Sequence, residues 1–324
     1  MPPRISLITT AFNAASSISY TLDSVLSQKY NDFEHIIIDA KSSDETLQII
    51  ESYRPRYEKR GLSLIVISQS DKGIYDGMNK GLKYANGDII GFLNADDFFA
   101  SNDVLDFIAW GFDRPDNVQI IYANITYINA HHKPLRPLKG KPFSRLGFMC
   151  GFHPPHPSFY AKKRLYEQYG NFNLKFNIAA DYELMLRFLY KYALKSFYID
   201  KCFVKMRVGG ASNVSLKNIF KANLQCAQAW RENHLSTLPL FILLKPLTKL
   251  KDRLIMLFRS NGGGDRVGFI ALWYFTFYRS FLSIFSPSLF SQLAHPYFAL
   301  LSLFSYPLGV FTPVAKSPLR LQYA

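Results

Sequence analysis

The sequence contains few cysteines and no unbroken apolar stretch of the roughly 20 residues that cross a bilayer. Its three cysteines lie at positions 150, 202 and 226, and this spacing matches neither a zinc site nor a disulfide framework. We therefore expect reduced, buried thiols. The N-terminal residues MPPRISLITTAFN lack the apolar core and cleavage site of a signal peptide, which predicts a cytoplasmic protein.

Acidic residues are also scarce, since 24 acidic side chains face 38 basic ones and the net charge is +14. From residue 237 onward nine basic residues accompany only two acidic ones. The same region holds two aromatic-rich apolar runs, at 267–278 and 297–311. Such runs with cationic flanks are typical of segments that lie in an anionic membrane interface. Residues 233–324 are therefore predicted to be a helical, apolar, basic appendage on the inner face of the cell membrane. The alternative is a helical appendage that packs on the domain or on a second subunit of a homo-oligomer.

Several motifs of nucleotide-dependent proteins are missing. The chain has no P-loop, so phosphates would be held by a metal and side chains rather than by a glycine cradle. The stretch TTAFNAASS after the first strand is not the glycine- and arginine-rich loop of a nucleotidyltransferase. The basic residues form no recognition helix or aromatic platform, which argues against a nucleic-acid partner.

With 48% hydrophobic residues, the chain can bury a full core, and its first 112 residues alternate between strand and helix patterns. Strands are expected at 5–9, 34–39, 64–67 and 89–93, and helices at 18–28, from Ser43, at 75–85 and at 104–112. Asp44 and Glu45 are expected in the first turn of the second helix, where acids offset the dipole. This alternation predicts an α/β fold with a Rossmann-like, mostly parallel sheet and helices on both faces.

Polar residues follow the ends of these strands, where ligands gather in parallel sheets. They are Thr9 to Asn13, Asp39, and Asn94 to Asp97. Asp39 could accept hydrogen bonds from a ribose or a base, or it could cap the next helix, although Ser42 or Ser43 can already fill that role.

Asp96 and Asp97 are adjacent carboxylates at the end of an apolar run. Two such charges repel each other unless a cation lies between them, and Mg²⁺ and Mn²⁺ prefer oxygen ligands. A diphosphate leaving group needs such a cation to neutralise its negative charge. The alternative, a pair of caps for the helix from Val104, is weak because Ser101 and Asn102 stand closer to it.

The segment DKGIYDGMNKG, residues 71–81, carries glycines at 73, 77 and 81 within a helical pattern. Glycine weakens a helix interior by about 1 kcal/mol, so a close approach must compensate. We expect that approach to be toward a ligand, with Lys72, Tyr75 and Asn79 nearby.

The motifs TTAFN, IIIDAKSSDET, DKGIYDGMNKG and FLNADDFF together resemble the family 2 glycosyltransferases, which are inverting enzymes of the GT-A fold that use nucleotide sugars. The third motif is similar to that of the branch that builds bacterial exopolysaccharides of the colanic-acid type. The resemblance covers about residues 4–212. Ala40, Lys41 and Glu45 depart from the family pattern, while Asp39 is kept.

The resemblance implies roles for particular residues. Thr9, Ala11, Asn13 and Asp39 would line the base and ribose of the donor. Asp97 would coordinate the metal on the diphosphate, and Asp96 would contact the ribose or a second metal position. Lys72 would offset phosphate charge, although a solvated lysine is the alternative.

The base that an inverting transfer requires is expected in AADYELMLRFLYKY, residues 179–192, which has helical apolar spacing. Asp181 matches the position of the family's catalytic base, and a helix cap is the alternative. In GFHPPHPSFY, His156 is expected near the acceptor or the metal, unless it is only a loop residue. The run at 208–212 resembles a loop that closes over the site.

Together these features predict a glycosyltransferase domain at 1–232, with a nucleotide-sugar half at about 1–125 and an acceptor half at about 126–232. The predicted reaction is the Mg²⁺- or Mn²⁺-dependent transfer of a sugar from a nucleotide diphosphate sugar. The predicted acceptor is a saccharide, as a polyprenyl-linked oligosaccharide in cell-surface polysaccharide synthesis. A non-catalytic scaffold subunit is the alternative.

Overall fold

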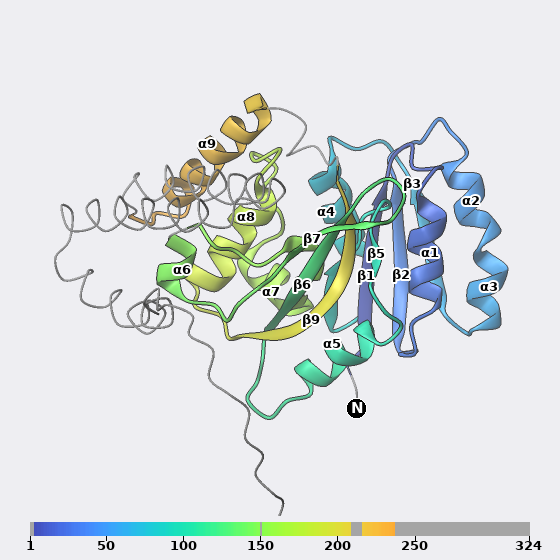
Figure 1. Cartoon of the computed structure of the whole chain (residues 1–324), viewed down its shortest axis with the longest axis horizontal. Helices are drawn as coiled ribbons and strands as arrows, with labels where there is room; N and C mark the ends of the chain where they lie inside the picture. The colour runs from blue at the N-terminus through green and yellow to red at the C-terminus, as the bar shows by residue number, and fades with distance from the viewer. Residues whose placement is uncertain (1–2, 150, 209–215, 237–324) are drawn as a thin grey trace, which may run out of the picture. The chain divides into compact units, whose positions relative to one another are not determined.

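The computed structural model describes residues 3–149, 151–208 and 216–236 (Figure 1). Almost all of the predicted appendage at 233–324 lies outside this range, and so does the predicted closing loop after Val208. Among the described residues, none of the helices combines the length and the hydropathy that a membrane span requires.

One half of the sheet is parallel. Its strands are β1 (Ile5–Ala11), β2 (Phe33–Asp39), β3 (Ser63–Ser68) and β4 (Ile89–Phe92), in the order β3-β2-β1-β4. All seven residues of β2 are buried, as the run HIII predicted for a strand covered on both faces. The carboxyl ends of the four strands therefore lie at one edge of the sheet.

The other half is mixed. It contains β8 (Tyr160–Lys162), β6 (Ile120–Ile128), β9 (Ser196–Arg207), β5 (Phe98–Phe99) and β7 (Pro134–Leu138). Strand β8 joins the halves because it pairs antiparallel with both β4 and β6. The long strands β6 and β9 run parallel to each other, and β5 and β7 pair antiparallel with them. The α/β architecture with a mostly parallel sheet is thus confirmed.

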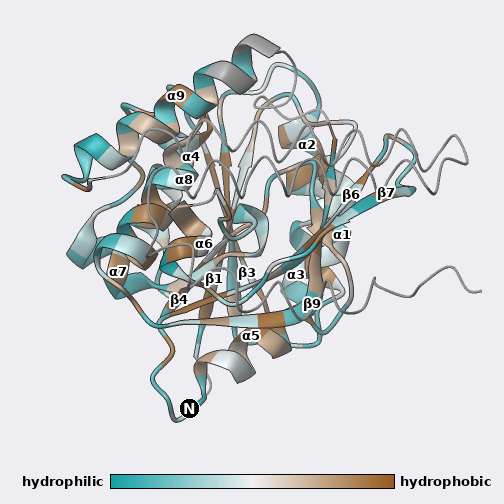
Figure 2. Ribbon diagram, turned by 60° about the vertical axis from the view of Figure 1, so that its left-hand side comes forward, coloured by the Kyte–Doolittle hydropathy of each residue, from teal (hydrophilic) through white to brown (hydrophobic). Residues whose placement is uncertain are grey.

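Helices cover both faces of the sheet, and alternate residues of a strand separate two cores. Ile37 of β2 packs in one core, while Ile36 and Ile38 pack in the other. The first core is covered by α1 (Ile18–Leu26), α2 (Thr46–Ser52), α3 (Arg54–Lys59) and α5 (Val104–Phe112). The second is covered by α4 (Ile74–Tyr84), α6 (Arg145–Met149), α7 (Lys163–Tyr169), α8 (Ala180–Met185) and α9 (Leu216–Glu232). In Figure 2 hydrophobic residues occur along the central strands and on individual turns of the helices beside them, where they alternate with hydrophilic turns.

Gly77, Gly81 and Gly91 mark places where elements come unusually close. A Cβ at Gly81 of α4 would collide with Cγ2 of Ile8, and a Cβ at Gly77 would lie 3.0 Å from Cγ2 of Thr10. The helix thus packs directly on β1. The glycines of this motif were expected to approach a ligand, and that expectation is wrong for these two positions, because the near neighbour is a strand. At Gly91 a Cβ would collide with the Tyr160 ring on the adjacent strand β8.

The second predicted helix begins later than expected. It starts at Thr46 rather than at Ser43, and it has no acidic residue in its first turn. The Asp44 carboxylate instead accepts hydrogen bonds from the Thr46 main-chain N–H at 3.0 Å and from the Ala15 N–H at 3.1 Å. These bonds hold residues 43–45 in a turn, because a short acidic side chain competes with the helix for main-chain donors.

Candidate active site

Asp39 lies at the sheet edge formed by the carboxyl ends of the parallel strands β1–β4, which we call the ligand edge. It is next to the ends of two other strands. It is aligned with Ala11 of β1 and with Ser68 of β3. Its carboxylate is fully buried and accepts hydrogen bonds from the Ser68 hydroxyl at 2.6 Å and the Ser42 main-chain N–H at 3.3 Å. The alternative role of Asp39 as the cap of the following helix is not observed, because the N-cap residue of α2 is Glu45.

The loops after β1 and β2 are bound to each other through Asn13. Its side-chain oxygen accepts a hydrogen bond from the Ser43 N–H at 2.9 Å, and its own N–H donates to the Ser42 hydroxyl at 2.9 Å. Its φ of 48° lies in the left-handed region, which asparagine tolerates better than most residues. Thr9, by contrast, is buried in the sheet and pairs with His35 Nε2 at 2.8 Å, so its hydroxyl already has a partner away from the edge.

The turn that carries Asp96 and Asp97 follows β4 and is held from two distant parts of the chain. The Thr21 hydroxyl of α1 donates to the main-chain oxygen of Asp97 at 2.7 Å. The Arg207 main-chain N–H, at the end of β9, donates to Asp97 Oδ1 at 3.1 Å. The pairing of β5 with β9 brings Arg207 to this turn.

The two carboxylates are electrostatically strained. Burial raises the pKa of Asp97 well above its ordinary value, and the negative charge of Asp96 raises it further. Burial also raises the pKa of Asp96, and the positive charge of Arg207 opposes this shift. With Asp97 only 1% exposed, water cannot relieve the repulsion. The pair would therefore be stabilised by a cation.

Asp181 lies at the start of α8, in the other half of the domain. Its Oδ1 accepts hydrogen bonds from the Tyr75 hydroxyl of α4 at 3.0 Å and from the Tyr182 main-chain N–H at 2.8 Å. The residue in the N-cap position is Ala179, so the alternative role of Asp181 as a helix cap is not observed. Tyr75 also stacks on Phe172, with ring centroids 5.5 Å apart.

His156 lies between the end of β4 and Asp181. Its ring stacks on Phe92 with centroids 5.9 Å apart and meets Phe172 edge-on at 5.8 Å. Burial lowers the pKa of His156, and the charge of Asp181 partly offsets this shift. The imidazole is therefore neutral near pH 7, as a metal ligand or a hydrogen-bond acceptor must be.

The other residues of the 71–81 motif have partners within the protein. The Asn79 side chain pairs with both main-chain groups of Phe172, at 2.9 and 3.0 Å. Lys72 is exposed, and its main-chain N–H donates to the Asp76 carboxylate at 3.0 Å. Asn79 therefore ties α4 to the segment before α8.

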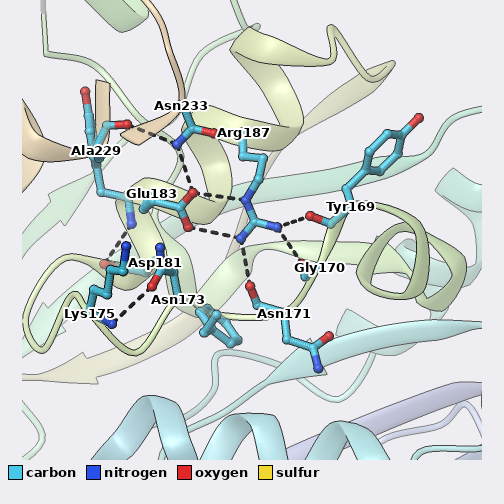
Figure 3. A network of polar contacts seen from close by, with 12 residues as sticks. Tyr169, Gly170, Asn171, Asn173, Lys175, Asp181, Glu183, Arg187, Ala229 and Asn233 are labelled. Carbon is cyan, nitrogen blue, oxygen red and sulfur yellow. Dashed lines mark hydrogen bonds and ion pairs between the residues drawn. The ribbon is translucent and has the colours of Figure 1, made fainter. Parts of the chain in front are cut away.

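A buried ion pair supports the helix that carries Asp181 (Figure 3). Arg187 lies one turn after Glu183. Its Nε and Nη2 atoms each donate a hydrogen bond of 3.0 Å to a different oxygen of the Glu183 carboxylate. Arg187 also donates to the main-chain oxygens of Tyr169, Gly170 and Asn171. From beyond the end of α9, Asn233 donates to Glu183 at 2.9 Å. The network fixes α8 against the preceding loop and against α9.

Comparison with known proteins decides the family. Residues 6–179, more than half of the chain, match the family described as Glycosyl transferase family 2. The chain belongs to glycosyl transferase family 2. A "PGL/p-HBAD biosynthesis glycosyltransferase" of Mycobacterium bovis is 27% identical over 223 residues, which are 68% of this chain and 84% of that protein. An "Uncharacterized glycosyltransferase EpsJ" of Bacillus subtilis is 34% identical over 101 residues, covering 31% of this chain and 28% of its own.

Solved structures share the fold of this family 2 glycosyltransferase. TarS residues 1–349 from S. aureus, in complex with UDP-GlcNAc, superposes with a TM-score of 0.53 and 19% identity, over 70% of this chain and 66% of that chain. The mannosyltransferase PcManGT from Pyrobaculum calidifontis, in complex with GDP-Man and Mn²⁺, gives a TM-score of 0.54 and 15% identity, over 94% and 82%. The predicted GT-A-type fold and the predicted family are confirmed.

The carboxylates of Asp96 and Asp97 in this family 2 glycosyltransferase are suitable ligands for a divalent cation. Mg²⁺ is usually held by one or two carboxylates together with substrate phosphates, and Asp96 and Asp97 supply that number. Across residues 3–236, outside the two gaps, no three His, Cys, Asp or Glu side chains are placed to share a metal. His156 thus forms no such group with the two aspartates, and its observed neighbours are aromatic rings and Asp181.

Three contributors to this candidate site were not expected from the sequence. Ser68 bonds Asp39, Arg207 bonds Asp97, and Gln225 of α9 accepts hydrogen bonds from the main-chain N–H groups of Ile178 and Ala179, at 3.0 and 3.1 Å. Their separations in sequence from the residues they contact range from 29 to 110. Only the sheet pairing and the packing of α9 bring them there. The sequence YIDKCFVKMRV, residues 198–208, has the composition of a strand, and the end of this run was the one signal available for Arg207.

Two cavities of about 480 and 430 Å³ lie away from these residues. The first is lined by Phe143, Arg145 and residues 193–198, and the second lies between α4 and α7. Neither includes any residue of the ligand edge. The donor site is therefore assigned from the sheet edge and its chemistry.

Proposed function

We propose that this glycosyltransferase is an inverting, divalent-cation-dependent enzyme that moves a sugar from a nucleotide diphosphate sugar to a hydroxyl of a lipid-linked oligosaccharide. The relevant domain is 1–232, with donor and acceptor halves that meet near residue 125. The donor nucleotide would lie along the ends of β1 and β2, against Ala11, Asn13 and Asp39. Its diphosphate would lie at Asp96 and Asp97.

One observation carries the proposal. Asp96 and Asp97 have pKa values raised by burial, yet they follow β4 at the same edge as Asp39. A protein gains nothing in stability from a buried carboxylate, Asp97, beside a half-buried one, Asp96, whereas a bound cation and diphosphate make both favourable. The fold neighbours complexed with UDP-GlcNAc and with GDP-Man and Mn²⁺ support a nucleotide sugar as the donor.

In the proposed reaction, Asp181 accepts the proton of the acceptor hydroxyl. The hydroxyl oxygen forms a bond to the anomeric carbon as the bond from that carbon to the diphosphate oxygen breaks, so the configuration inverts. A divalent cation bound at Asp96 and Asp97 would neutralise charge on the departing diphosphate. His156 would face the acceptor, next to Asp181, as a neutral hydrogen-bonding group.

The acceptor is proposed from the chain as a whole. Residues 267–278 and 297–311 carry the apolar runs, and the region from 237 onward holds the excess of basic residues. A protein on the inner face of the membrane would meet polyprenyl-linked oligosaccharides there.

The test is a panel of nucleotide sugars, including UDP-GlcNAc and GDP-mannose, with Mn²⁺ or Mg²⁺. Release of free nucleoside diphosphate would identify the donor. Asp97→Asn should lose cation-dependent donor binding in calorimetry, because it removes a ligand charge. Asp181→Asn should bind donor normally and lose turnover by at least about 100-fold, which is typical for a lost general base.

Two outcomes contradict the proposal. Unchanged calorimetric affinity in Asp97→Asn would remove the cation site, and full turnover in Asp181→Asn would remove the base. Asp103→Asn is the matched control for both variants. Asp103 is the N-cap residue of α5, and its carboxylate contacts the Ser101 hydroxyl. This substitution should change neither donor binding nor turnover.

A further inference from the structure

Among the residues that the structure describes, the carboxylate of Asp181 is held on one oxygen only. The Tyr75 hydroxyl and the Tyr182 main-chain N–H both contact Oδ1, at 3.0 and 2.8 Å. A carboxylate with one oxygen fixed by two donors cannot rotate freely about its Cβ–Cγ bond. Oδ2 is thereby left as the oxygen that can receive a proton from an acceptor.

The Tyr75 hydroxyl is the donor in its hydrogen bond to Asp181. Burial raises the pKa of the Tyr75 phenol well above its ordinary value, and the charge of Asp181 raises it further, so the hydroxyl keeps its proton. That single proton has two acceptors, since the Ile178 main-chain oxygen is also 3.0 Å away. An ionised carboxylate is the stronger acceptor. The Tyr75 proton therefore points to Asp181 while Asp181 is ionised.

The backbone below Asp181 is held by a second side chain. Helix α8 has no side-chain cap of its own. Gln225, from α9, accepts hydrogen bonds from the N–H groups of Ile178 and Ala179 through Oε1, and its amide nitrogen donates to Asn177 Oδ1 at 2.6 Å. Gln225 is 9% exposed, so water competes little for these bonds. It acts as a cap supplied from more than 40 residues further along the chain.

We propose that Tyr75 and Gln225 are positioning residues for sugar transfer. Tyr75 selects Oδ2 of Asp181 as the oxygen that takes the proton, and Gln225 fixes the turn that carries Asp181. The inference rests on the proposed role of Asp181 as the base. It assigns to Tyr75 a different role from the ligand contact that the glycine pattern of residues 71–81 predicted.

The first experiment is Tyr75→Phe in the full chain, assayed by hydrolysis of the nucleotide sugar from the panel that the wild-type chain hydrolyses fastest. A base displaced or rotated by an ångström costs up to about 100-fold in rate. We expect kcat to fall about 10- to 100-fold, with KM for the donor changed less than twofold. A donor-contact role for Tyr75 would instead raise KM.

Tyr166→Phe is the matched control. The Tyr166 hydroxyl is buried in the same core and has no hydrogen-bond partner within the described part of the chain. Like Tyr75→Phe, Tyr166→Phe removes a phenolic hydroxyl from this side of the sheet, but it leaves the hydrogen bonds of Asp181 in place. We expect kcat and KM to be unchanged.

The second experiment separates positioning by Gln225 from general stability. Gln225→Met keeps the size of the side chain and removes both acceptor bonds, so kcat should fall about 10-fold at unchanged KM. Gln225→Glu keeps an oxygen acceptor for the two N–H groups, so its kcat should be close to that of the wild type. If Gln225→Met does not fold, Gln225→Glu and Tyr75→Phe still decide.

The outcomes distinguish this inference from the proposed function. If Asp181→Asn keeps full activity, the proposed base is wrong and the inference fails with it. If Asp181→Asn is inactive while Tyr75→Phe and Tyr166→Phe both match the wild type in kcat, the base stands and the positioning role of Tyr75 is overturned. A loss of kcat in Gln225→Met that Gln225→Glu does not recover overturns the role of Gln225.

Discussion

At the scale of single residues, the site contrasts two kinds of buried carboxylate. Asp39 is satisfied by Ser68 and Ser42, whereas Asp97 has a raised pKa and a charged neighbour. The first is compatible with a stable metal-free protein. The second costs stability that a ligand must return, as is common where stability has been traded for function.

This contrast predicts that Asp97→Asn stabilises the metal-free protein. Because the pKa of Asp97 is raised in the folded state, the folded state prefers the protonated form. The wild type therefore loses stability as pH rises from the unfolded pKa of about 3.9 through the raised folded pKa, by about 1.4 kcal/mol for each pH unit that separates the two. The asparagine variant, which does not ionise, should show no such loss.

Thermal melts in EDTA from pH 4.5 to 8 measure the effect. The advantage of Asp97→Asn should grow with pH and level off, and Mn²⁺ with a nucleoside diphosphate should raise the Tm of the wild type only. A variant that is less stable than the wild type at pH 8 would contradict the assignment of strain to this aspartate.

The aspartate pair could be predicted from the sequence because two adjacent acids after an apolar run are rare without a ligand. The role of Arg207 could not, since it donates to Asp97 across 110 residues. Likewise, the hydrogen bond from Tyr75 to Asp181 joins α4 to α8 across 106 residues. Local pattern carries no information on such pairings.

At the scale of elements, strongly periodic segments were predictable and short ones were not. The helix at 104–112 has the predicted bounds, and the first four parallel strands agree to within two residues. Strands β5 and β8 have two and three residues, too few for any alternation to be visible. These short strands nevertheless bring Arg207 to Asp97 and join the two halves of the sheet.

Helix α8 is predicted to depend on the Glu183–Arg187 pair (Figure 3). The side chains are 4% and 10% exposed, so Arg187→Met would leave a buried carboxylate and three main-chain oxygens without their donor. Breaking such a pair costs about 3–5 kcal/mol. We expect the Tm to fall by on the order of 10 °C.

Arg54→Met is the matched control, because Arg54 pairs with Glu51 at one-turn spacing with side chains 40% and 45% exposed. Exposed pairs contribute less than about 1 kcal/mol. Replacing Glu183 and Arg187 together with methionine should recover part of the loss. Equal melting temperatures for Arg187→Met and Arg54→Met would show that the buried network contributes nothing.

At the scale of the whole molecule, the uneven distribution of charge leads to a prediction about membranes. We expect the full chain to float with liposomes that contain anionic lipid and not with neutral ones, as the basic residues after 237 favour anionic surfaces. A chain that ends at Ser236 keeps the bond from Asn233 to Glu183 and should not float. Binding should weaken between 50 and 300 mM salt as the Debye length shortens.

No flotation of the full chain at low salt would contradict a membrane role. A full chain that elutes as a dimer, beside a monomeric chain ending at Ser236, would favour the subunit-packing alternative instead. The sequence could indicate this region as basic and apolar. It could not separate a lipid surface from a protein surface, since both bury the same side chains.

The contact between Gly91 and the Tyr160 ring has a consequence for the sequences of related proteins. The ring occupies the space in which a side chain at position 91 would stand, so the two sites share one fixed volume. Relatives that keep this strand pair are expected to carry a small residue at one site whenever the other is bulky. A Gly91→Ala chain should accordingly fold only when Tyr160 is shortened at the same time, a compensatory pair that a selection from a two-site library would recover.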